Sequence, residues 1–364
     1  MVYHALGLMS GSSLDGLDLV FAHFHEQGGQ WSYEIEKTAC YPYAASWENR
    51  LKTATGLPAR DYCQLHVDYG HYLGQEINRF INENNLHYKI GLIGSHGHTV
   101  FHSPASGLTA QIGEGAALAA ETGLPVISDL RSMDLAYGGQ GAPLVPMGER
   151  CLFPDYTLFL NIGGIANITR GGESYIAFDI CPANRVLNLL ANKLGKPFDE
   201  NGAMAAKGKV ITDLLSQLNA HSYYKQRFPK SLANELGTDE HFPLLLNSGY
   251  AIEDLLATYT QHVAEQIAAS ARSLVNSQSE GKQKMLVTGG GALNKHLIES
   301  LTQQLQSNDI EVVIPDEQLV QYKEALIMAF LGVLRWRQEY TVIPTVTGAR
   351  RASIGGALWN GQEA

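Results

Sequence analysis

The sequence predicts an α/β protein composed of two lobes of similar design. The chain has 364 residues, which is too long for one ordinary hydrophobic core and favours two domains. Each half begins with an apolar strand, a turn of small residues and a second strand, and continues with alternating helices and strands. A cleft between two such lobes is a natural place for a ligand.

The first half contains the clearest strand and helix signals. Apolar runs at residues 4–9 and 17–24 predict two strands joined by a Gly/Ser turn. Residues 61–84 carry apolar side chains at helical spacing and predict a long helix. A strand, a short helix and a second buried strand are then expected at residues 90–94, 116–122 and 125–128.

The second half repeats this order after a turn-rich stretch, YGGQGAPLVP, at residues 137–146. Three strands and two helices are expected at residues 157–162, 165–169, 252–274, 284–287 and 324–337. We therefore expect residues 1–137 to form one lobe, with residues 349–364 packing back on it, and residues 138–348 to form the other.

Composition excludes several classes of function. The net charge is −10 and the chain has no basic stripe, so we expect no nucleic-acid partner. The N-terminal residues lack the pattern of a signal peptide, and no apolar run approaches the roughly 18 residues of a membrane span. The four cysteines are scattered, as in a reduced protein, so we expect a cytoplasmic protein without a membrane partner.

The first of three glycine turns, SGSS at residues 10–13, can offer backbone N–H groups and hydroxyls to a phosphate. Asp15 and Asp18 follow it, and two carboxylates would repel a polyphosphate unless a divalent cation lay between them. Mg²⁺ takes one or two carboxylates together with phosphate oxygens and water, so the pattern suits Mg-ATP. The alternative is an ordinary hairpin with Asp15-Gly16 at its turn.

Two further glycine turns lie in the second half. LNIGGIANIT at residues 160–169 is a two-glycine hairpin, and VTGGGALN at residues 287–294 joins a strand to a helix, where bare backbone suits a phosphate or a nucleotide sugar. Taken singly, each also fits an ordinary tight connection, and none is a Walker A loop or a dinucleotide fingerprint. The candidates for nucleotide binding are Gly11, Ser12, Ser13, Asp15, Asp18, Gly163, Gly164, Gly289, Gly290 and Gly291, with Asp15 and Asp18 as the metal neighbours.

The order of the three turns resembles the two phosphate motifs and the adenosine motif of the actin-like ATPase superfamily. Longer strings narrow the resemblance to the anhydro-N-acetylmuramic acid kinase family, over essentially the whole chain. These strings are GLMSGSSLDGLD, SHGHTVFH, QIGEGAALA, DLRSMD, GGQGAPLVP, LNIGGIANIT, FDICPANR, PKS, VTGGGALN and KEALIMAF.

The resemblance implies a two-lobed actin-like fold with ribonuclease H-like lobes, and a bacterial, cytoplasmic, dimeric enzyme of peptidoglycan recycling. It implies ATP and Mg²⁺ as cofactors and 1,6-anhydro-N-acetylmuramic acid as substrate. Water would open the 1,6-anhydro bridge while the γ-phosphate moves to O6, giving N-acetylmuramic acid 6-phosphate and ADP.

The resemblance also assigns site residues. Asp179 matches the catalytic aspartate and would be the general base, and Glu324 matches a glutamate near the sugar. Arg131 is expected to bind the lactyl carboxylate, because arginine binds carboxylates bidentately. The residues expected to contact the sugar are Ser10, His96, Arg131 and Asn184.

Each assignment has an ordinary alternative. Asp179 would otherwise be a solvated acid at a strand end, and Glu324 an exposed acid in the first turn of a helix. Arg131 would otherwise form a salt bridge with Asp129 or Asp134.

The chain departs from the family pattern in three places. The usual GFDTGPAN is replaced by AFDICPAN, with Ala177, Ile180 and Cys181, which puts the fine geometry around Asp179 in question. His98 stands where Gln is common, and Ser12 replaces a Thr; both keep a hydrogen-bonding group.

Two other functions remain open from the sequence. His96, His98 and His102 superficially resemble a metal cluster, which would suit a metal-dependent hydrolase, although no carboxylate follows at close spacing. A non-catalytic actin-like protein that binds ATP is the second alternative, because fold does not fix function.

Overall fold

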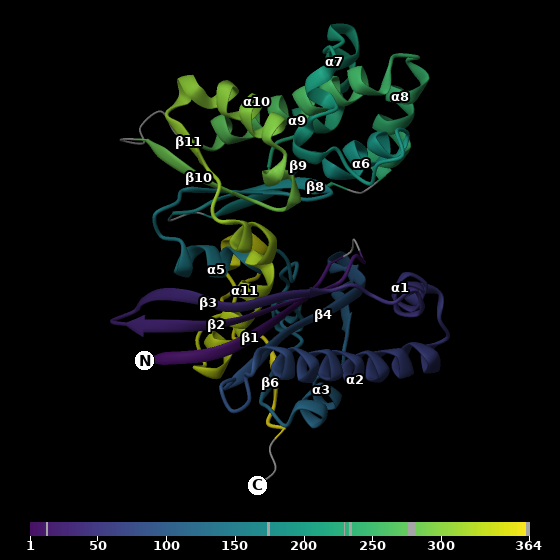
Figure 1. Ribbon diagram of the computed structural model, residues 1–364. Helices are drawn as coiled ribbons and strands as arrows, with labels where there is room; N and C mark the ends of the chain where they lie inside the picture. The colour runs from purple at the N-terminus through teal and green to yellow at the C-terminus, as the bar shows by residue number, and fades with distance from the viewer. Residues whose placement is uncertain (12–13, 173–174, 229, 233–234, 276–281, 362–364) are drawn as a thin grey trace. The chain divides into compact units, whose positions relative to one another are not determined.

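The computed structural model describes residues 1–11, 14–172, 175–228, 230–232, 235–275 and 282–361 (Figure 1). The chain divides into two compact units, Met1–Pro154 with Tyr322–Ala364, and Asp155–Gln321, and each is described by itself. Within the described residues, no helix combines the length and the apolar character needed to cross a membrane.

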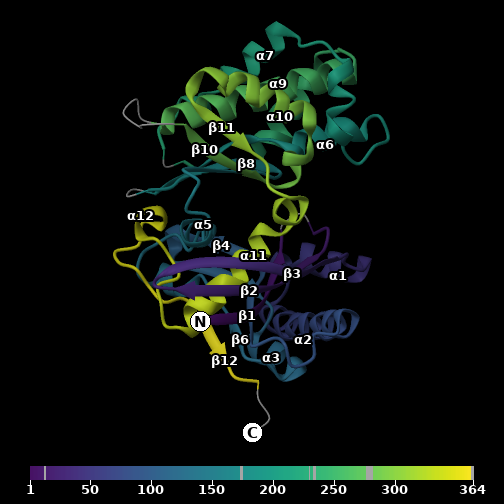
Figure 2. The ribbon, with the colours of Figure 1, turned by 60° about the vertical axis from the view of Figure 1, so that its left-hand side comes forward.

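The first unit is built on a mixed sheet with the strand order β12-β6-β4-β1-β2-β3, and β5 pairs with β4. β2 is antiparallel to β1 and to β3, whereas β1, β4 and β6 are parallel. Figure 2 shows β12 beside β6 at one edge of this sheet. The strands are β1 (Val2–Ser10), β2 (Leu17–Gln27), β3 (Gln30–Tyr41), β4 (Leu92–Ser103), β5 (Leu108–Ile112), β6 (Val126–Ser128) and β12 (Ala357–Trp359).

Helices pack on both faces of this sheet. Apolar side chains of α2, such as Leu73 and Phe80, share a core with Leu6 and Phe21 of the strands. α11 covers the other face, where Phe330 contacts Phe24. The helices of this unit are α1 (Ala45–Lys52), α2 (Ala59–Asn84), α3 (Gly115–Thr122), α4 (Ser132–Ala136), α5 (Val145–Leu152), most of α11 (Glu317–Trp336) and α12 (Pro344–Thr347).

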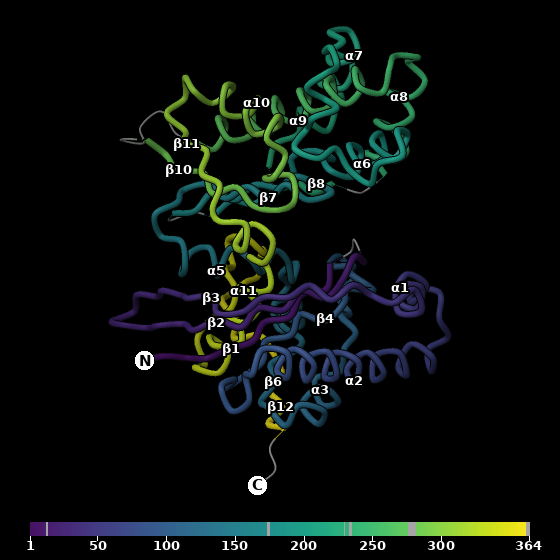
Figure 3. Tube along the Cα trace, viewed as in Figure 1, coloured from purple at the N-terminus to yellow at the C-terminus, as the bar shows by residue number. Residues whose placement is uncertain are grey.

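The second unit has a five-stranded sheet with the order β11-β10-β7-β8-β9, in which β7 is central (Figure 3). β8 is antiparallel to β7 and to β9, whereas β7, β10 and β11 are parallel. The elements of this unit are β7 (Leu158–Ile162), β8 (Ile165–Arg170), β9 (Ile176–Pro182), α6 (Asn184–Asn192), α7 (Thr212–Asn219), α8 (Phe242–Asn247), α9 (Ile252–Leu274), β10 (Gln283–Thr288), α10 (Lys295–Leu305) and β11 (Ile310–Val313).

Both sheets follow one plan. When β5 and β12 are left out and the strands are numbered within each unit, each central sheet has the order 3-2-1-4-5, with the second strand antiparallel to its neighbours. This is the ribonuclease H-like arrangement, and its presence in both units confirms the predicted α/β fold with two similarly built lobes. The cleft expected between the lobes stays a prediction.

The boundaries of the units differ from those expected. Residues 138–154 and 322–348 belong to the first unit, not to the second. The physical reason is that α5 packs against β3, and that α11 returns to the first sheet, where Ala325 and Ala329 lie against Gly7. The turn-rich stretch 137–146 is therefore a connection inside the first unit.

α11 lies so close to the sheet that two strand positions, Gly7 and Gly94, require glycine. A Cβ added at Gly94 would be 2.2 Å from the backbone oxygen of Met328, and backbone cannot move aside cheaply. We expect Gly94→Ala to lower the free energy of unfolding of the first unit by about 1–3 kcal/mol. Gly56→Ala is the matched control, because no atom of the described residues lies within 4 Å of a Cβ at that position.

Urea denaturation followed by tryptophan fluorescence measures this effect. All four tryptophans lie in the first unit, so the signal reports on that unit: Trp31, Trp47, Trp336 and Trp359. Equal unfolding midpoints for the two variants would show that the contact of α11 with the sheet is looser than the structure has it.

Candidate functional site

Two carboxylates, Asp15 and Glu324, lie within electrostatic reach of a third, Asp18, in the first unit. Asp18 is on β2, Asp15 is in the turn before it, and Glu324 is in the middle of α11. Burial raises the pKa of Asp18 to about 6; a hydrogen bond from Cys40 lowers it, and the charges of Asp15 and Glu324 raise it. Burial also raises the pKa of Glu324, so the alternative of an exposed acid in a first helical turn is wrong.

Arg131 lies beside this group and is held by neutral partners. Its guanidinium donates to His96 Nε2 at 2.7 Å and to the carbonyl of Gly141 at 3.0 Å. Burial lowers the pKa of His96 to about 3, with a further contribution from Arg131, so the imidazole is neutral and accepts the bond. Burial lowers the pKa of Arg131 to about 10, while Glu324 raises it, so the arginine keeps its charge at neutral pH.

Arg131 does not form the salt bridge that was its alternative role. Asp129 accepts a hydrogen bond from Ser132 at 2.5 Å. Asp134 is fully buried and accepts bonds from the backbone of Gly141 and from Thr347. Among the residues that the structure describes, neither acid pairs with the guanidinium, which therefore remains a cation with uncharged hydrogen-bond partners.

Ser10 makes two side-chain hydrogen bonds within the first unit. Its side chain is only 4% exposed, and its Oγ bonds to His98 Nδ1 at 3.0 Å and to the Tyr43 hydroxyl at 2.7 Å. Tyr43 bonds in turn to Tyr69 at 2.6 Å. The hydroxyl predicted to contact the sugar is thus satisfied inside the first unit. Ser12 and Ser13 lie outside the described residues.

The histidines of β4 do not form a metal cluster. His96 donates from Nδ1 to the carbonyl of Gly97 and accepts from Arg131, a cation. His98 faces Ser10, and the exposed His102 bonds to Thr109. The interpretation as a metal-dependent hydrolase through these three histidines is therefore wrong.

Asp179 of β9, in the second unit, is held by three hydrogen bonds. Its Oδ2 accepts a bond from the backbone N–H of Leu232 at 2.9 Å, and its own carbonyl accepts one from the Tyr223 hydroxyl at 2.6 Å. Its N–H donates to the carbonyl of Lys230 at 3.2 Å. These bonds fix the backbone and one carboxylate oxygen, whereas Oδ1 has no hydrogen-bond partner among the described residues.

Burial raises the pKa of Asp179, and the bond from Leu232 lowers it. The residue is therefore not the freely solvated acid of the alternative interpretation. A partly buried carboxylate with one oxygen held and the other available is the arrangement that a general base needs.

The two glycine turns of the second unit meet at Asn184. The Asn184 side chain donates to the carbonyl of Ile162 at 3.0 Å, and its backbone N–H donates to the carbonyl of Gly163. A Cβ added at Gly291 would be 3.1 Å from Asn184 Oδ1. Gly163, Gly290 and Gly291 thus lie around one asparagine that was expected to contact the sugar. Gly164 lies against Arg185, and Gly289 lies against Asn161 and Ile162.

The backbone conformation at Gly289 explains why glycine is needed there. Gly289 has φ +82°, and a Cβ there would be 2.5 Å from Asn161 Oδ1. The chain then passes through a short turn to α10, whose first turn is capped by Asn294 Oδ1 accepting from Leu297 N–H at 3.1 Å. The predicted order of strand, glycine turn and helix is therefore confirmed.

A cavity of about 330 Å³ lies elsewhere in the first unit. Among the residues that line it are His66, Ser95, His96, Asp129 and Trp359. Of the predicted site residues that the structure describes, His96 alone lines it, and neither Asp18 nor Glu324 takes part. The cavity thus borders the Arg131–His96 pair, but Asp15, Asp18 and Glu324 do not line it.

Some residues of these groups were not predicted from the sequence. Tyr223 and Leu232 hold Asp179 from a loop more than 40 residues away along the chain. Lys323, next to Glu324, forms a buried ion pair with Glu149 at 2.8 Å. The strings PKS and KEALIMAF mark the neighbourhoods of Leu232 and Lys323, but no spacing rule connects these residues to their partners.

Two ribonuclease H-like units, with acids and glycine turns at the ends of their strands, define the architecture of the actin-like ATPases and sugar kinases. The chain belongs to the anhydro-N-acetylmuramic acid kinase family, whose model matches residues 3–361.

Curated relatives cover nearly the whole chain. An anhydro-N-acetylmuramic acid kinase from Bacillus cereus is 32% identical and covers 97% of this chain and 96% of its own length. One from Bacillus thuringiensis is 30% identical and covers 98% of each. Among solved structures, the activator of the 2-hydroxyisocaproyl-CoA dehydratase from Clostridium difficile with bound ADPNP has a TM-score of 0.44 at 14% identity, over 90% of this chain and 94% of that chain. A similarity of that size supports no argument.

Proposed function

We propose that this chain uses ATP and water to convert 1,6-anhydro-N-acetylmuramic acid to N-acetylmuramic acid 6-phosphate and ADP, a step of peptidoglycan recycling. Its membership of the kinase family over residues 3–361 carries this proposal. The environment of Asp179 supports it, because the reaction needs a base that a non-catalytic nucleotide binder does not.

In the proposed reaction, Asp179 takes a proton from the water that attacks C1. The C1–O6 bond breaks, and O6 becomes the nucleophile toward the γ-phosphorus of ATP, from which ADP leaves. Leu232 N–H holds Oδ2 of Asp179 and the Tyr223 hydroxyl holds its backbone carbonyl, which leaves Oδ1 for the water.

The charged groups of the first unit are assigned to the sugar. Arg131 binds the lactyl carboxylate, since its present partners, His96 and a carbonyl, are neutral. Glu324, in its raised-pKa environment, orients the sugar or the water. Ser10 acts indirectly in this scheme, because its hydroxyl is bonded to His98 and Tyr43.

Asp15 and Asp18 fit the Mg²⁺ that phosphoryl transfer from ATP requires. The pKa of Asp18 is raised to about 6 by burial and by neighbouring acids, and a divalent cation would remove this penalty on its charged form. Mg²⁺ supplies charge neutralisation for the phosphates. Gly11, Ser12 and Ser13 would face the phosphates, and Gly163, Gly164 and Gly289–Gly291 the rest of the nucleotide. The protein is further proposed to act in the cytoplasm as a homodimer.

Turnover in ¹⁸O-labelled water tests this function. We expect one labelled oxygen at C1 of the sugar product and none in its phosphate, because water attacks carbon and not phosphorus. Mass spectrometry of the product and of its dephosphorylated form locates the label. A reaction without sugar is the control for background ATP hydrolysis. Label in the phosphate, or ATP consumption that does not depend on the sugar, would overturn the proposal.

A further inference from the structure

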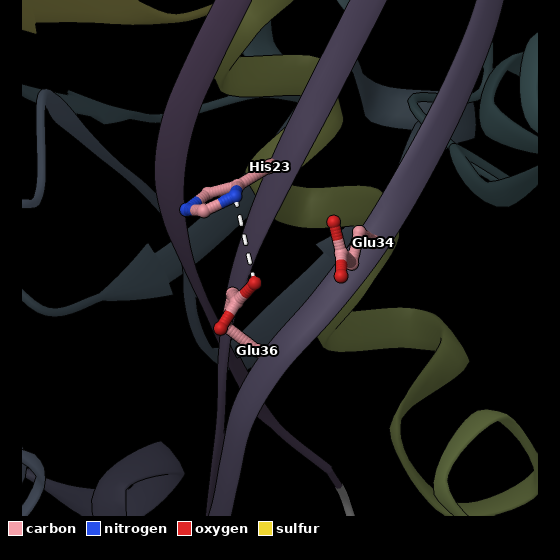
Figure 4. Close-up of side chains that lie close together, drawn as sticks. All are labelled: His23, Glu34 and Glu36. Atoms are coloured by element: carbon pink, nitrogen blue, oxygen red, sulfur yellow. Dashed lines mark ion pairs between the residues drawn. The ribbon is translucent and has the colours of Figure 1, made fainter.

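Three metal-ligating side chains meet on the β2–β3 edge of the first unit, away from every group described above. They are His23, Glu34 and Glu36, whose ligand atoms all lie within 4.8 Å of one another (Figure 4). No other group of three or more His, Cys, Asp or Glu side chains in the described part of the chain converges this closely.

The register of the strands produces this convergence. His23 of β2 stands opposite Glu34 of β3, so both side chains leave the same face of the sheet. The pairs then shift by one residue, because Ala22 faces Ile35 while Phe21 faces Lys37. Glu36 is the extra residue of this β-bulge, and the bulge turns its carboxylate toward His23.

The distances suit a shared ion better than a direct bond. His23 Nδ1 lies 3.6 Å from Glu36 Oε1, which is too long for a hydrogen bond. Ligand atoms around one four-coordinate Zn²⁺ are about 3.3 Å apart, as bonds of about 2.0–2.1 Å require. Small side-chain rotations would therefore bring all three ligands into range without any change in the backbone.

The imidazole is held in a form that can bind metal. The His4 ring stacks on the His23 ring, with centroids 4.2 Å apart, and the Phe21 ring meets its edge. Burial lowers the pKa of His23, His4 and His25 lower it further, and Glu36 and Glu34 raise it. A neutral imidazole with a fixed ring is the usual state of a metal-binding histidine.

We propose that His23, Glu34 and Glu36 bind one Zn²⁺ ion, with water as the remaining ligand. An imidazole with two carboxylates favours Zn²⁺ over Mg²⁺ or Ca²⁺, which prefer oxygen ligands alone. The ion would join β2 to β3 at the bulge, where the ladder is interrupted and the sheet ends. The carboxylates of Glu34 and Glu36 on this edge strand could also serve only to discourage pairing with another chain. That role would not require His23, nor that the three side chains point toward one another.

Zinc titration of the chelator-treated full-length protein, with a chromophoric competitor and excess Mg²⁺, tests the site. The chain has 13 histidines, so the comparison between variants decides the outcome. We expect His23→Gln and Glu36→Gln to lose one Zn²⁺ equivalent, or at least tenfold in its affinity. His71→Gln is the matched control, because His71 and Glu121 form a His–Glu pair at 2.7 Å that belongs to no converging group of three ligands in the described part of the chain.

Two further measurements exclude indirect effects. The wild-type protein and His71→Gln should give the same Co²⁺ absorption band and the same rise in unfolding temperature with Zn²⁺, and both signals should be absent in the His23 and Glu36 variants. Without metal, all variants should unfold at the same temperature. Undiminished zinc binding by the His23→Gln/Glu36→Gln double variant, or an equal loss in His71→Gln, would overturn the proposal. None of these outcomes depends on the kinase reaction.

Discussion

Replacing Asp179 with Asn is expected to lower turnover by roughly 10²–10⁴-fold while ATP still binds. The amide has the same shape and still accepts the bond from Leu232 N–H, so the local structure should persist. What it lacks is the negative charge that takes a proton from the attacking water. Steady-state kinetics measure the first effect, and nucleotide titration of the variant measures the second.

Asp213→Asn is the control for this variant. Asp213 is an exposed aspartate at the start of α7, in the same unit, and its change should leave turnover within about twofold. Because burial raises the pKa of Asp179, the wild-type kcat/KM should fall, as the pH is lowered, at a higher pH than an ordinary aspartate would give. A near-wild-type turnover number for Asp179→Asn would remove this residue from the role of base.

The fold was predictable because its defining signals are local. The strand, small-residue turn and second strand at the start of each half are visible as runs of apolar residues, and they became β1–β2 and β7–β8. β3 was missed because it is an edge strand, whose alternating charged residues, such as Glu34 and Glu36, weaken the apolar pattern. The unit boundary was placed wrongly because no local signal tells that α11 returns to the first sheet.

The candidate site likewise contains residues that the sequence indicates and residues that it does not. Asp179, Glu324 and Arg131 were found through motifs, that is, through similarity to a family. Their supports were not, because the Tyr223 hydroxyl and the Leu232 N–H act on Asp179 through contacts that only tertiary structure creates. The β-bulge that brings Glu36 to His23 likewise depends on the register of two strands and leaves no mark in the sequence.

Replacing Lys323 with Met is expected to destabilise the first unit by about 3–5 kcal/mol. Its ammonium lies 2.8 Å from Glu149 Oε1, and the two side chains are 4% and 3% exposed. The other oxygen of Glu149 is buried and has no hydrogen-bond partner in the part of the chain that the structure describes. Without Lys323, a carboxylate between α5 and α11 would keep its desolvation penalty and lose its counter-ion. Urea denaturation followed by tryptophan fluorescence, which reports on this unit alone, gives the change in the free energy of unfolding.

Two comparisons separate this penalty from other causes. Lys89→Met changes an exposed lysine of the same unit and should change stability by less than about 0.5 kcal/mol. The double variant Lys323→Met/Glu149→Leu should regain most of the lost stability, because apolar residues can replace a buried ion pair at little cost.

The same double variant also separates stability from activity. The charge of Lys323 lowers the pKa of Glu324, whereas Glu149 raises it. The contribution of Lys323 is the larger of the two, so a protein that is restored in stability but has neither charge should have a higher pKa at Glu324. Its pH–rate profile should then shift to higher pH if that acid orients the sugar or the water. If Lys323→Met unfolds like the wild type, the ion pair does not hold α11 in place. Glu324 would then depend on the glycine contacts of α11 with the sheet for its position.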